Sequence, residues 1–210
     1  MILTDSHFHL DENGLNEKDD YGVVSVCSEI ELESFLSQKK LYSNKNLYVS
    51  AGAFSFYNFL DKPEIVIENG RKDVLMLEQL LKVNDIDAVG EAILDASTYE
   101  RKATLKEQTE IFADEINLAA KYKKPLVVHS VKTLPQIFEM SHLLKKVPAV
   151  IFHGFGGAVQ QAESLLNRGI NCFFSLGTSL INGKKSAKAC ASALDVKRLL
   201  LETDFPFCRL

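Results

Sequence analysis

The segment Ile2-Leu3-Thr4-Asp5-Ser6-His7-Phe8-His9 places a polar cluster directly after a short apolar run at the start of the chain. If residues 2–9 form a strand, side chains alternate, so that His7 and His9 project to one side while Phe8 faces the other. Two imidazoles on one face of a strand are a suitable pair of metal ligands. The segment therefore predicts a first strand that ends in a metal site, if later strands deliver further ligands to the same place.

The length and composition are typical of a globular protein. We expect residues 1–210 to form a single domain, which is enough chain to bury a full core. Hydrophobic residues make up 46% of the chain and charged residues 25%. The formal charge of −4 argues against a protein that coats nucleic acid through a broad basic surface. It leaves room for a small site that neutralises phosphate with metal ions.

Cysteine usage and hydropathy point to a cytoplasmic protein. No stretch approaches the ~20 apolar residues of a membrane span, so we expect no membrane partner. The cysteines are far apart in the sequence and form no C-x-x-C pair, so we expect free thiols. They are Cys27, Cys172, Cys190 and Cys208.

Short apolar runs alternate with helical patterns along the rest of the chain. Strands are expected at residues 2–9, 23–27, 47–52, 86–94, 126–129, 149–153, 171–176 and 198–201. Helices are expected at residues 29–42, 73–83, 105–123, 134–146, 159–168 and 185–194. The strands are continuous apolar runs, as in parallel sheets that are covered on both faces.

This alternation predicts an α/β fold and favours a (β/α)8 TIM barrel over an open doubly wound sheet. The pattern alone does not exclude the open sheet. No Gly-x-Gly-x-x-Gly follows the first strand, which argues against a dinucleotide-binding sheet. The chain ends six residues after Asp204, so the barrel is expected to lack the helix after strand eight. Without that helix, apolar surface on strands one and eight, around Leu199 and Leu201, would be left uncovered. Exposed apolar surface tends to recruit a partner, so we expect self-association.

Six potential metal ligands stand at or near the ends of predicted strands. The carboxyl ends of the strands form one rim of a barrel, and barrel enzymes place their active sites there. We therefore expect the six potential ligands to meet at this rim. Mixed imidazole and carboxylate ligands suit two divalent ions with one bridging carboxylate, and Zn, Mg or Mn are the expected metals. His142 lies within a predicted helix and is expected at the surface. The six are His7, His9, Glu91, His129, His153 and Asp204.

Five segments resemble the TatD family of metal-dependent deoxyribonucleases, and the resemblance covers nearly the whole chain. The Glu-Thr-Asp-x-Pro of the last segment is the most specific of them. The segments are Asp5-Ser6-His7-Phe8-His9, Gly90-Glu91-Ala92-Ile93-Leu94-Asp95, Val128-His129-Ser130, Phe152-His153-Gly154-Phe155-Gly156-Gly157 and Leu201-Glu202-Thr203-Asp204-Phe205-Pro206.

The resemblance implies a TIM barrel with a two-metal site that hydrolyses phosphodiesters, often from the 3′ end of DNA. It implies that His7, His9 and Asp204 hold one metal and that His129 and His153 hold the other, with Glu91 between them. Asp204 and Glu91 are the implied catalytic residues, and Asp204 would orient or deprotonate the attacking water. Asp5 and Asp95 would be carboxylates that orient the ligands.

The chain departs from the family pattern at groups that hold substrate. Phe54 stands where the family usually has a histidine, and Val131 stands where it usually has an arginine suited to a phosphate oxygen. The leading interpretation is a deoxyribonuclease (3′–5′ exonuclease) or phosphodiesterase acting on DNA ends or another small phosphodiester. A non-catalytic metal-binding barrel is one alternative. An amidohydrolase-like hydrolase of a non-nucleic-acid substrate is another, although Glu91, and no lysine, stands on strand four.

Overall fold

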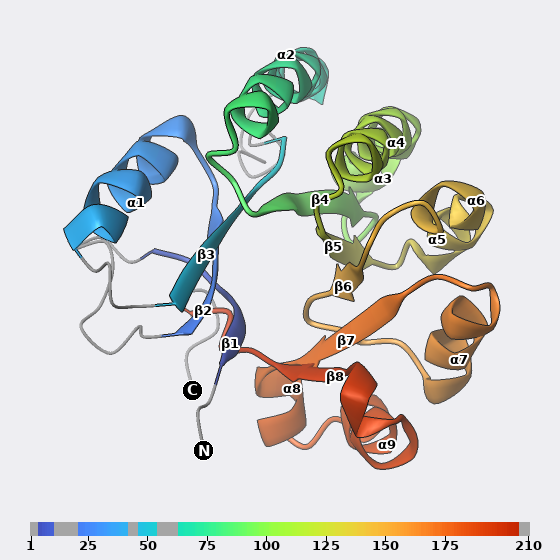
Figure 1. Cartoon of the computed structure of the whole chain (residues 1–210). Coiled ribbons are helices and arrows are strands. Elements are labelled where there is room, and N and C mark those ends of the chain that lie inside the picture. The colour runs from blue at the N-terminus through green and yellow to red at the C-terminus, as the bar shows by residue number, and fades with distance from the viewer. Residues whose placement is uncertain (1–3, 11–20, 42–45, 54–62, 206–210) are drawn as a thin grey trace.

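Eight parallel strands form a single sheet in which each strand pairs with the next one in the chain (Figure 1). The computed structural model describes residues 4–10, 21–41, 46–53 and 63–205. The sheet curls until its first and last strands meet, which confirms the predicted (β/α)8 barrel. The strands are β1 (Asp5–Phe8), β2 (Tyr21–Val26), β3 (Asn46–Ala51), β4 (Ala88–Asp95), β5 (Leu126–Val131), β6 (Val150–Phe152), β7 (Cys172–Leu176) and β8 (Leu199–Leu201).

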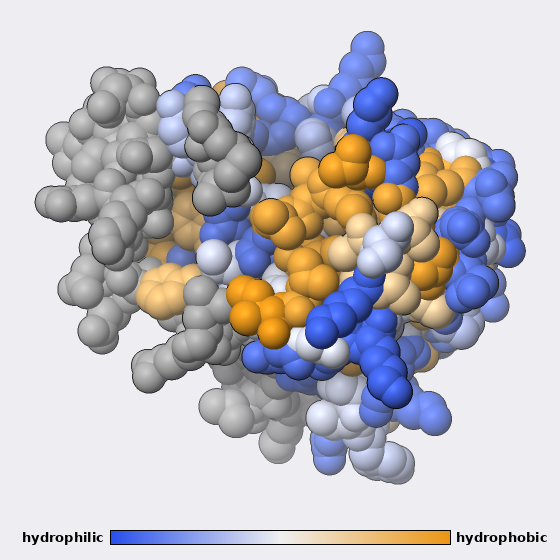
Figure 2. Space-filling view, turned by 90° about the horizontal axis from the view of Figure 1, so that it is seen from below, coloured by the Kyte–Doolittle hydropathy of each residue, from blue (hydrophilic) through white to orange (hydrophobic). Residues whose placement is uncertain are grey.

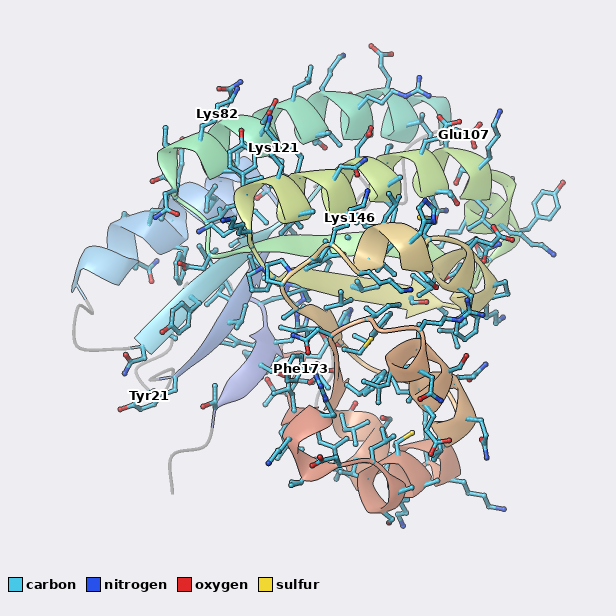
Figure 3. The ribbon with its side chains drawn as sticks, turned by 45° about the vertical axis from the view of Figure 1, so that its right-hand side comes forward. Tyr21, Lys82, Glu107, Lys121, Lys146 and Phe173 are labelled. Atoms are coloured by element: carbon cyan, nitrogen blue, oxygen red, sulfur yellow. The ribbon has the colours of Figure 1, made fainter. Side chains whose placement is uncertain are left out.

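Helices surround the sheet on its outer side (Figure 1). Charged side chains of α2 and α4, among them Lys82, Lys121 and Glu107, point away from the sheet (Figure 3). Lys121 Nζ pairs with Glu78 Oε1 at 2.6 Å and so joins these two helices. The helices are α1 (Glu29–Leu41), α2 (Pro63–Val83), α3 (Tyr99–Ala103), α4 (Leu105–Tyr122), α5 (Leu134–Glu139), α6 (Ser141–Leu144), α7 (Val159–Asn167), α8 (Thr178–Ile181) and α9 (Lys185–Ala193), with a 3-10 turn, η2, at Val196–Arg198.

A large hydrophobic core extends through the barrel and under the helices, and a small second cluster contains Ala53, Ile93 and Ile111. Every residue of β4 is buried, as expected for a strand covered on both faces. The largest fully buried side chains include four phenylalanines, Phe35, Phe112, Phe152 and Phe174. Each such ring removes apolar surface from water and stabilises the fold by roughly 1.5–3 kcal/mol.

The observed helices differ from the expected ones at four places. Helix α2 begins at Pro63, ten residues before the expected start at residue 73, and proline is favourable in the first turn because it has no N–H to satisfy. Two short helices, α3 and α8, follow β4 and β7 and were not expected; Thr98 caps α3 by accepting a hydrogen bond from Arg101 N. The predicted helix at residues 134–146 is divided at Met140 into α5 and α6.

Main-chain and side-chain hydrogen bonds connect the start and the end of the sheet. Asp204 N donates to His7 O at 3.1 Å, and His9 N donates to Phe205 O at 2.7 Å. The Asp5 carboxylate accepts from Thr203 N at 3.1 Å and from Thr203 Oγ1 at 2.6 Å. Asp5 therefore closes the barrel, because it holds the segment after β8 against β1.

The structure also bears on the cysteines and on the search for a membrane span. Cys27, Cys172 and Cys190 are free, and Cys208 lies outside the described residues. Within the described part of the chain, no helix combines the length and apolar character needed to cross a bilayer. The cytoplasmic location stays a prediction.

The surface around β8 is apolar. No residue of β8 is fully buried, and Leu201 is 54% and Val196 77% exposed. Figure 2 looks up at the side where β8, α8 and α9 lie and shows apolar side chains gathered in the middle of that face. Within the described residues, which end at Phe205, no helix follows β8.

We predict that this apolar face mediates self-association, because contiguous exposed apolar surface tends to recruit a partner. Sedimentation velocity of the wild type should show dimers or larger species that increase with concentration. Leu201→Gln should shift the distribution toward monomers, whereas Leu75→Gln, which changes a 67%-exposed leucine on α2, should not. A wild type that stays monomeric at all concentrations would contradict the prediction.

Glu115 on α4 is a buried carboxyl group outside the strand-end cluster. Its Oε1 accepts a hydrogen bond from Ala53 N at 2.8 Å, just past the end of β3. A Cβ at Gly52 would lie 2.9 Å from this oxygen and 2.4 Å from the Glu91 main-chain oxygen, so only glycine fits where β3 passes. Burial, supported by the charges of Asp114 and Asp73, raises the pKa of Glu115 to about 8.

This raised pKa makes stability depend on pH in a defined direction. The folded protein binds the Glu115 proton more tightly than the unfolded chain, so the stabilisation is complete below pH ~4.5 and is lost as the pH rises to ~8. Glu115→Gln keeps the acceptor oxygen and removes the titration. Its free energy of unfolding should match that of the wild type near pH 4.5 and exceed it at pH 8 by roughly 1–4 kcal/mol. Urea unfolding at both pH values measures this, with the exposed Glu163→Gln as control; equal differences at both pH values would refute it.

Candidate metal centre

The structure brings all six predicted ligands to one rim of the barrel. His7 lies in β1, Glu91 in β4 and His129 in β5, while His9, His153 and Asp204 directly follow or lie just beyond β1, β6 and β8. The strands are parallel, so these positions share the carboxyl end of the sheet. His142 is exposed on α6, as expected, and lies outside the cluster.

Glu91 stands at the centre of the cluster and divides its two oxygens between two pairs of imidazoles. Oε1 lies 3.3 Å from His7 Nε2 and 3.2 Å from His9 Nε2. Oε2 lies 2.9 Å from His153 Nε2 and 3.4 Å from His129 Nδ1. A carboxylate in this position is placed to be shared by two adjacent ions.

The histidines at Glu91 Oε1, His7 and His9, form the first half of the cluster, and those at Oε2, His129 and His153, form the second half. Asp204 completes the first half. One of its oxygens, Oδ1, lies 3.6 Å from Nε2 of His7 and equally far from Nε2 of His9. Its side chain is 22% exposed, whereas that of Glu91 is nearly fully buried. Asp204 is therefore the carboxylate of the cluster that solvent can reach.

The distances between these atoms fit bound divalent ions. Nitrogen and oxygen ligands about 2.0–2.2 Å from a tetrahedral ion are separated from one another by roughly 3.3–3.6 Å. In the first half, the Nε2 atoms of His7 and His9 lie 3.2 Å from each other and 3.2 to 3.6 Å from Glu91 Oε1 and Asp204 Oδ1. Two groups, His7 with His9 and Asp204, and His7 with Glu91 and His153, bring three ligand atoms within 4.8 Å of one another.

The second half is closer together. His129 Nδ1 and His153 Nε2 are 2.9 Å apart, and both face Glu91 Oε2. The Nδ1 atoms of His7 and His153 are buried and have no hydrogen-bond partner among the described residues, whereas the Nε2 atoms of both rings face Glu91. The donor set and its geometry fit the divalent ions predicted from the sequence.

The ionisation of the cluster shows how its charges depend on one another. Burial and the neighbouring charge of His153 lower the pKa of His7 to about 4. Burial acts in the same direction on His9, but hydrogen bonds to Asp204 and the contact with Glu91 outweigh it and raise the pKa of His9. Burial opposes ionisation of Glu91, yet the charges of His153 and His7 hold the pKa of Glu91 well below its usual range. Glu91 is thus an ionised, buried acceptor that requires positive charge around it.

The main chain around Gly90 directs Glu91 into the cluster. Gly90 has φ of +137°, and a Cβ there would lie 2.4 Å from Val127 O, so β4 and β5 approach too closely for any side chain. The pairing of β4 with β5 also shifts register between Val89 and Ala92. Such irregularities re-aim a side chain, and of the two residues between Val89 and Ala92, Gly90 and Glu91, only Glu91 has one.

Asp95 supports the second half of the cluster. Its Oδ2 lies 3.5 Å from His129 Nε2 and accepts a short hydrogen bond from Arg101. Gln108 on α4 holds the main chain of Asp95 from both sides, since Oε1 accepts from Asp95 N and Nε2 donates to Asp95 O. Burial acts against ionisation, but hydrogen bonds from His129 and Ser97 and the charge of Arg101 lower the pKa of Asp95. The expected orienting role suits Asp95, while Asp5 acts on the main chain at the barrel seam.

Two residues contact the cluster without having been predicted to do so. Cys27 Sγ lies 3.4 Å from His9 Nδ1, on the side of the ring opposite to the cluster. Glu202 Oε1 accepts from Gly154 N at 2.5 Å and lies 3.9 Å from His153 Nδ1. Cys27 directly follows β2, so the rule that selected the histidines at strand ends also applies to it.

The two departures from the family pattern have different outcomes. Val131 is the last residue of β5, half-buried, and lies at the rim two residues after His129. Phe54 lies outside the described residues.

Comparisons with known proteins agree with the fold and the ligand set. A family model described as "TatD related DNase" matches residues 4–210. An uncharacterized metal-dependent hydrolase of Buchnera aphidicola is 28% identical over 232 residues, which cover 99% of this chain and 82% of that protein. A 3′–5′ ssDNA/RNA exonuclease TatD of Cronobacter turicensis is 27% identical over 134 residues, or 62% of this chain and 49% of that protein.

Solved structures share the fold. The TatD homologue YjjV of Escherichia coli K12 superposes with a TM-score of 0.70 and 24% identity, covering 91% of this chain and 70% of that chain. A TatD-family hydrolase of Entamoeba histolytica gives a TM-score of 0.69 and 17% identity, covering 99% and 76%. At these identities the likeness concerns the barrel alone.

The position of Glu91 predicts how metal binding responds to substitution. Glu91→Gln should weaken binding at both halves, because each half loses its share of one carboxylate charge, whereas His129→Ala should weaken mainly the second. Isothermal titration with Zn²⁺ or Mn²⁺, checked by elemental analysis after dialysis, should give up to two ions for the wild type. Replacing His142, which lies outside the cluster, is the control. Retention of one full-affinity ion by Glu91→Gln would contradict a shared carboxylate.

Proposed function

Because the chain belongs to the TatD-related DNase family of metal-dependent hydrolases, we propose that it hydrolyses phosphodiester bonds at DNA ends. The proposed reaction is a 3′–5′ exonuclease or closely related phosphodiesterase reaction with two divalent ions. Two of the relatives carry the name 3′–5′ ssDNA/RNA exonuclease, which supports this choice of substrate class.

The observation that carries the proposal is the division of the Glu91 oxygens between the pair His7 and His9 and the pair His129 and His153. A single carboxylate facing two imidazole pairs is suited to two ions, and two-ion sites are typical of enzymes that cleave phosphate esters. Ions bound there would polarise a phosphoryl oxygen and lower the pKa of a bound water.

Asp204 is the residue proposed to handle the proton. Its carboxylate adjoins His7 and His9 and is more exposed than that of Glu91. A water entering from the rim therefore reaches Asp204 first. It would orient this water and accept its proton. The main chain of Asp204 is fixed by the hydrogen bond to His7 O, which limits how far the carboxylate can move.

Strand four gives little support to the amidohydrolase alternative. Its residues, Ala88–Asp95, contain no lysine that a modification could convert into a bridging ligand, and Glu91 is the carboxylate proposed to bridge the two ions. A non-catalytic metal-binding barrel has the same ligands, so turnover is the measurement that separates it from the proposed enzyme.

Asp204→Asn tests the proposed chemistry. Asparagine accepts the left-handed backbone of this position (φ +52°) and the same space, but it is a far weaker base. We expect kcat for a 3′-terminal single-stranded DNA substrate with Mg²⁺ or Mn²⁺ to fall by about 10²–10⁴-fold. The free energy of unfolding should change by no more than about 0.5 kcal/mol, as for other replacements outside the core.

Asp85→Asn, an exposed replacement at the opposite end of the barrel, is the matched control and should leave kcat unchanged. If the wild type cleaves neither DNA nor bis-p-nitrophenyl phosphate with any of Mg²⁺, Mn²⁺ or Zn²⁺, the hydrolase proposal fails and the non-catalytic alternative takes its place.

A further inference from the structure

A cavity of about 510 Å³ opens beside the second half of the metal centre. His153 lines it and also faces Glu91, so the cavity begins where the cluster ends. Its walls come from the segments that follow β5, β6 and β7, with the β6–α7 segment in the middle. Its volume is in the range of pockets that hold one small ligand, such as a single nucleotide unit.

The charges that line the cavity are of one sign. Lys132, directly after β5, and Lys184, between α8 and α9, both line it, and none of its lining residues is an aspartate or glutamate. Neither lysine pairs with a carboxylate of a described residue; Lys132 Nζ approaches only the main-chain oxygen of Ser97, at 3.5 Å. In a chain with a formal charge of −4, this is a local cationic site.

The middle wall exposes main chain to the cavity. Gly154 and Gly156 are exposed, and a Cβ at either position would meet no atom closer than 3.7 Å, so the space in front of them is open. Phe155 between them is buried against Phe174, with ring centroids 4.7 Å apart, and anchors the segment. Half-buried Val131 and Leu134 add apolar surface on the β5 side.

We propose that this cavity binds the nucleotide unit next to the hydrolysed ester, and that Lys132 and Lys184 hold its phosphate. A phosphate is the anion that two unpaired lysines would recognise, and the sugar or base would lie against Val131 and Leu134. Lys132 then supplies a positive charge next to Val131, which stands where the family usually has an arginine. This inference rests on the proposed phosphodiester substrate, and it makes the enzyme selective for substrates with a second phosphate.

The binding step can be measured without metal or turnover. Thymidine 3′,5′-bisphosphate is titrated into the full chain in EDTA by calorimetry, with thymidine as the uncharged comparison. Lys132→Gln and Lys184→Gln keep most of the side chain and remove the charge, and each should weaken binding about five- to tenfold. Lys184→Arg should retain wild-type affinity. Lys146→Gln, between α6 and β6 at the other end of the barrel, should have no effect (Figure 3).

The same variants are then compared in hydrolysis with Mn²⁺. KM for the dinucleotide pTpT should rise about five- to tenfold in each lysine variant, with kcat nearly unchanged. KM for bis-p-nitrophenyl phosphate, which has no second phosphate, should change less than twofold. Thermal unfolding of each variant verifies that the fold is intact.

The outcomes separate this inference from the proposed function. The inference is overturned if the wild type does not bind the bisphosphate, if it binds thymidine equally well, or if Lys146→Gln weakens binding as much as the two lysine variants. Lysine-dependent binding without any metal-dependent turnover would retain the phosphate site and reject the hydrolase. Turnover with unchanged KM in both lysine variants would retain the hydrolase and reject the phosphate site.

Discussion

The carboxylate of Glu91 is the constraint on which the rest of the site depends. It is ionised and nearly fully buried, and a buried charge without partners costs several kcal/mol. Its partners are imidazoles from three other strands, so Glu91 can be accommodated only when β1, β5 and β6 bring their ends to it. Glu91 lies in the register shift between β4 and β5, next to Gly90, where the two strands approach too closely for a side chain.

The closure of the barrel and the assembly of the first half of the site rely on the same contacts. Asp5 binds Thr203, and the neighbouring Asp204 donates its main-chain N–H to His7. Each of these bonds holds the segment after β8 against β1, and together they set the position of the Asp204 carboxylate beside His7 and His9. A change at Asp5 would therefore disturb metal ligation and barrel closure together, although Asp5 contacts none of the ligand nitrogens.

The convergence of the six proposed ligands was predictable because five of them end or closely follow a predicted strand, and parallel strands deliver such positions to one edge. Glu91 lies within its apolar run and was selected as a carboxylate near the end of the fourth strand. The same logic was sufficient for the barrel. It was insufficient for α2, whose first half contains Gly70 and lacks a clear apolar face, and for α3 and α8, which are too short to show a period. The pairing of each Glu91 oxygen with two histidines depends on a local register shift that no residue pattern reveals. The contact of Cys27 with His9 was within reach of the strand-end rule, but a lone thiol is usually a packing residue.

The distribution of charge bears on how an acidic chain could carry out the proposed reaction on a polyanion. Some charges on the helices are paired, such as Lys121 with Glu78 and Arg71 with Glu110, and such pairs attract a distant phosphate only weakly. Beside the candidate metal centre, Lys132 and Lys184 have no carboxylate partner among the residues that the structure describes. Under the proposed function, the cluster and the cavity together would select a substrate end at short range, and the surrounding surface would add little attraction for long internal stretches of duplex. Such a division favours a protein that acts on the ends of a chain over one that binds along it.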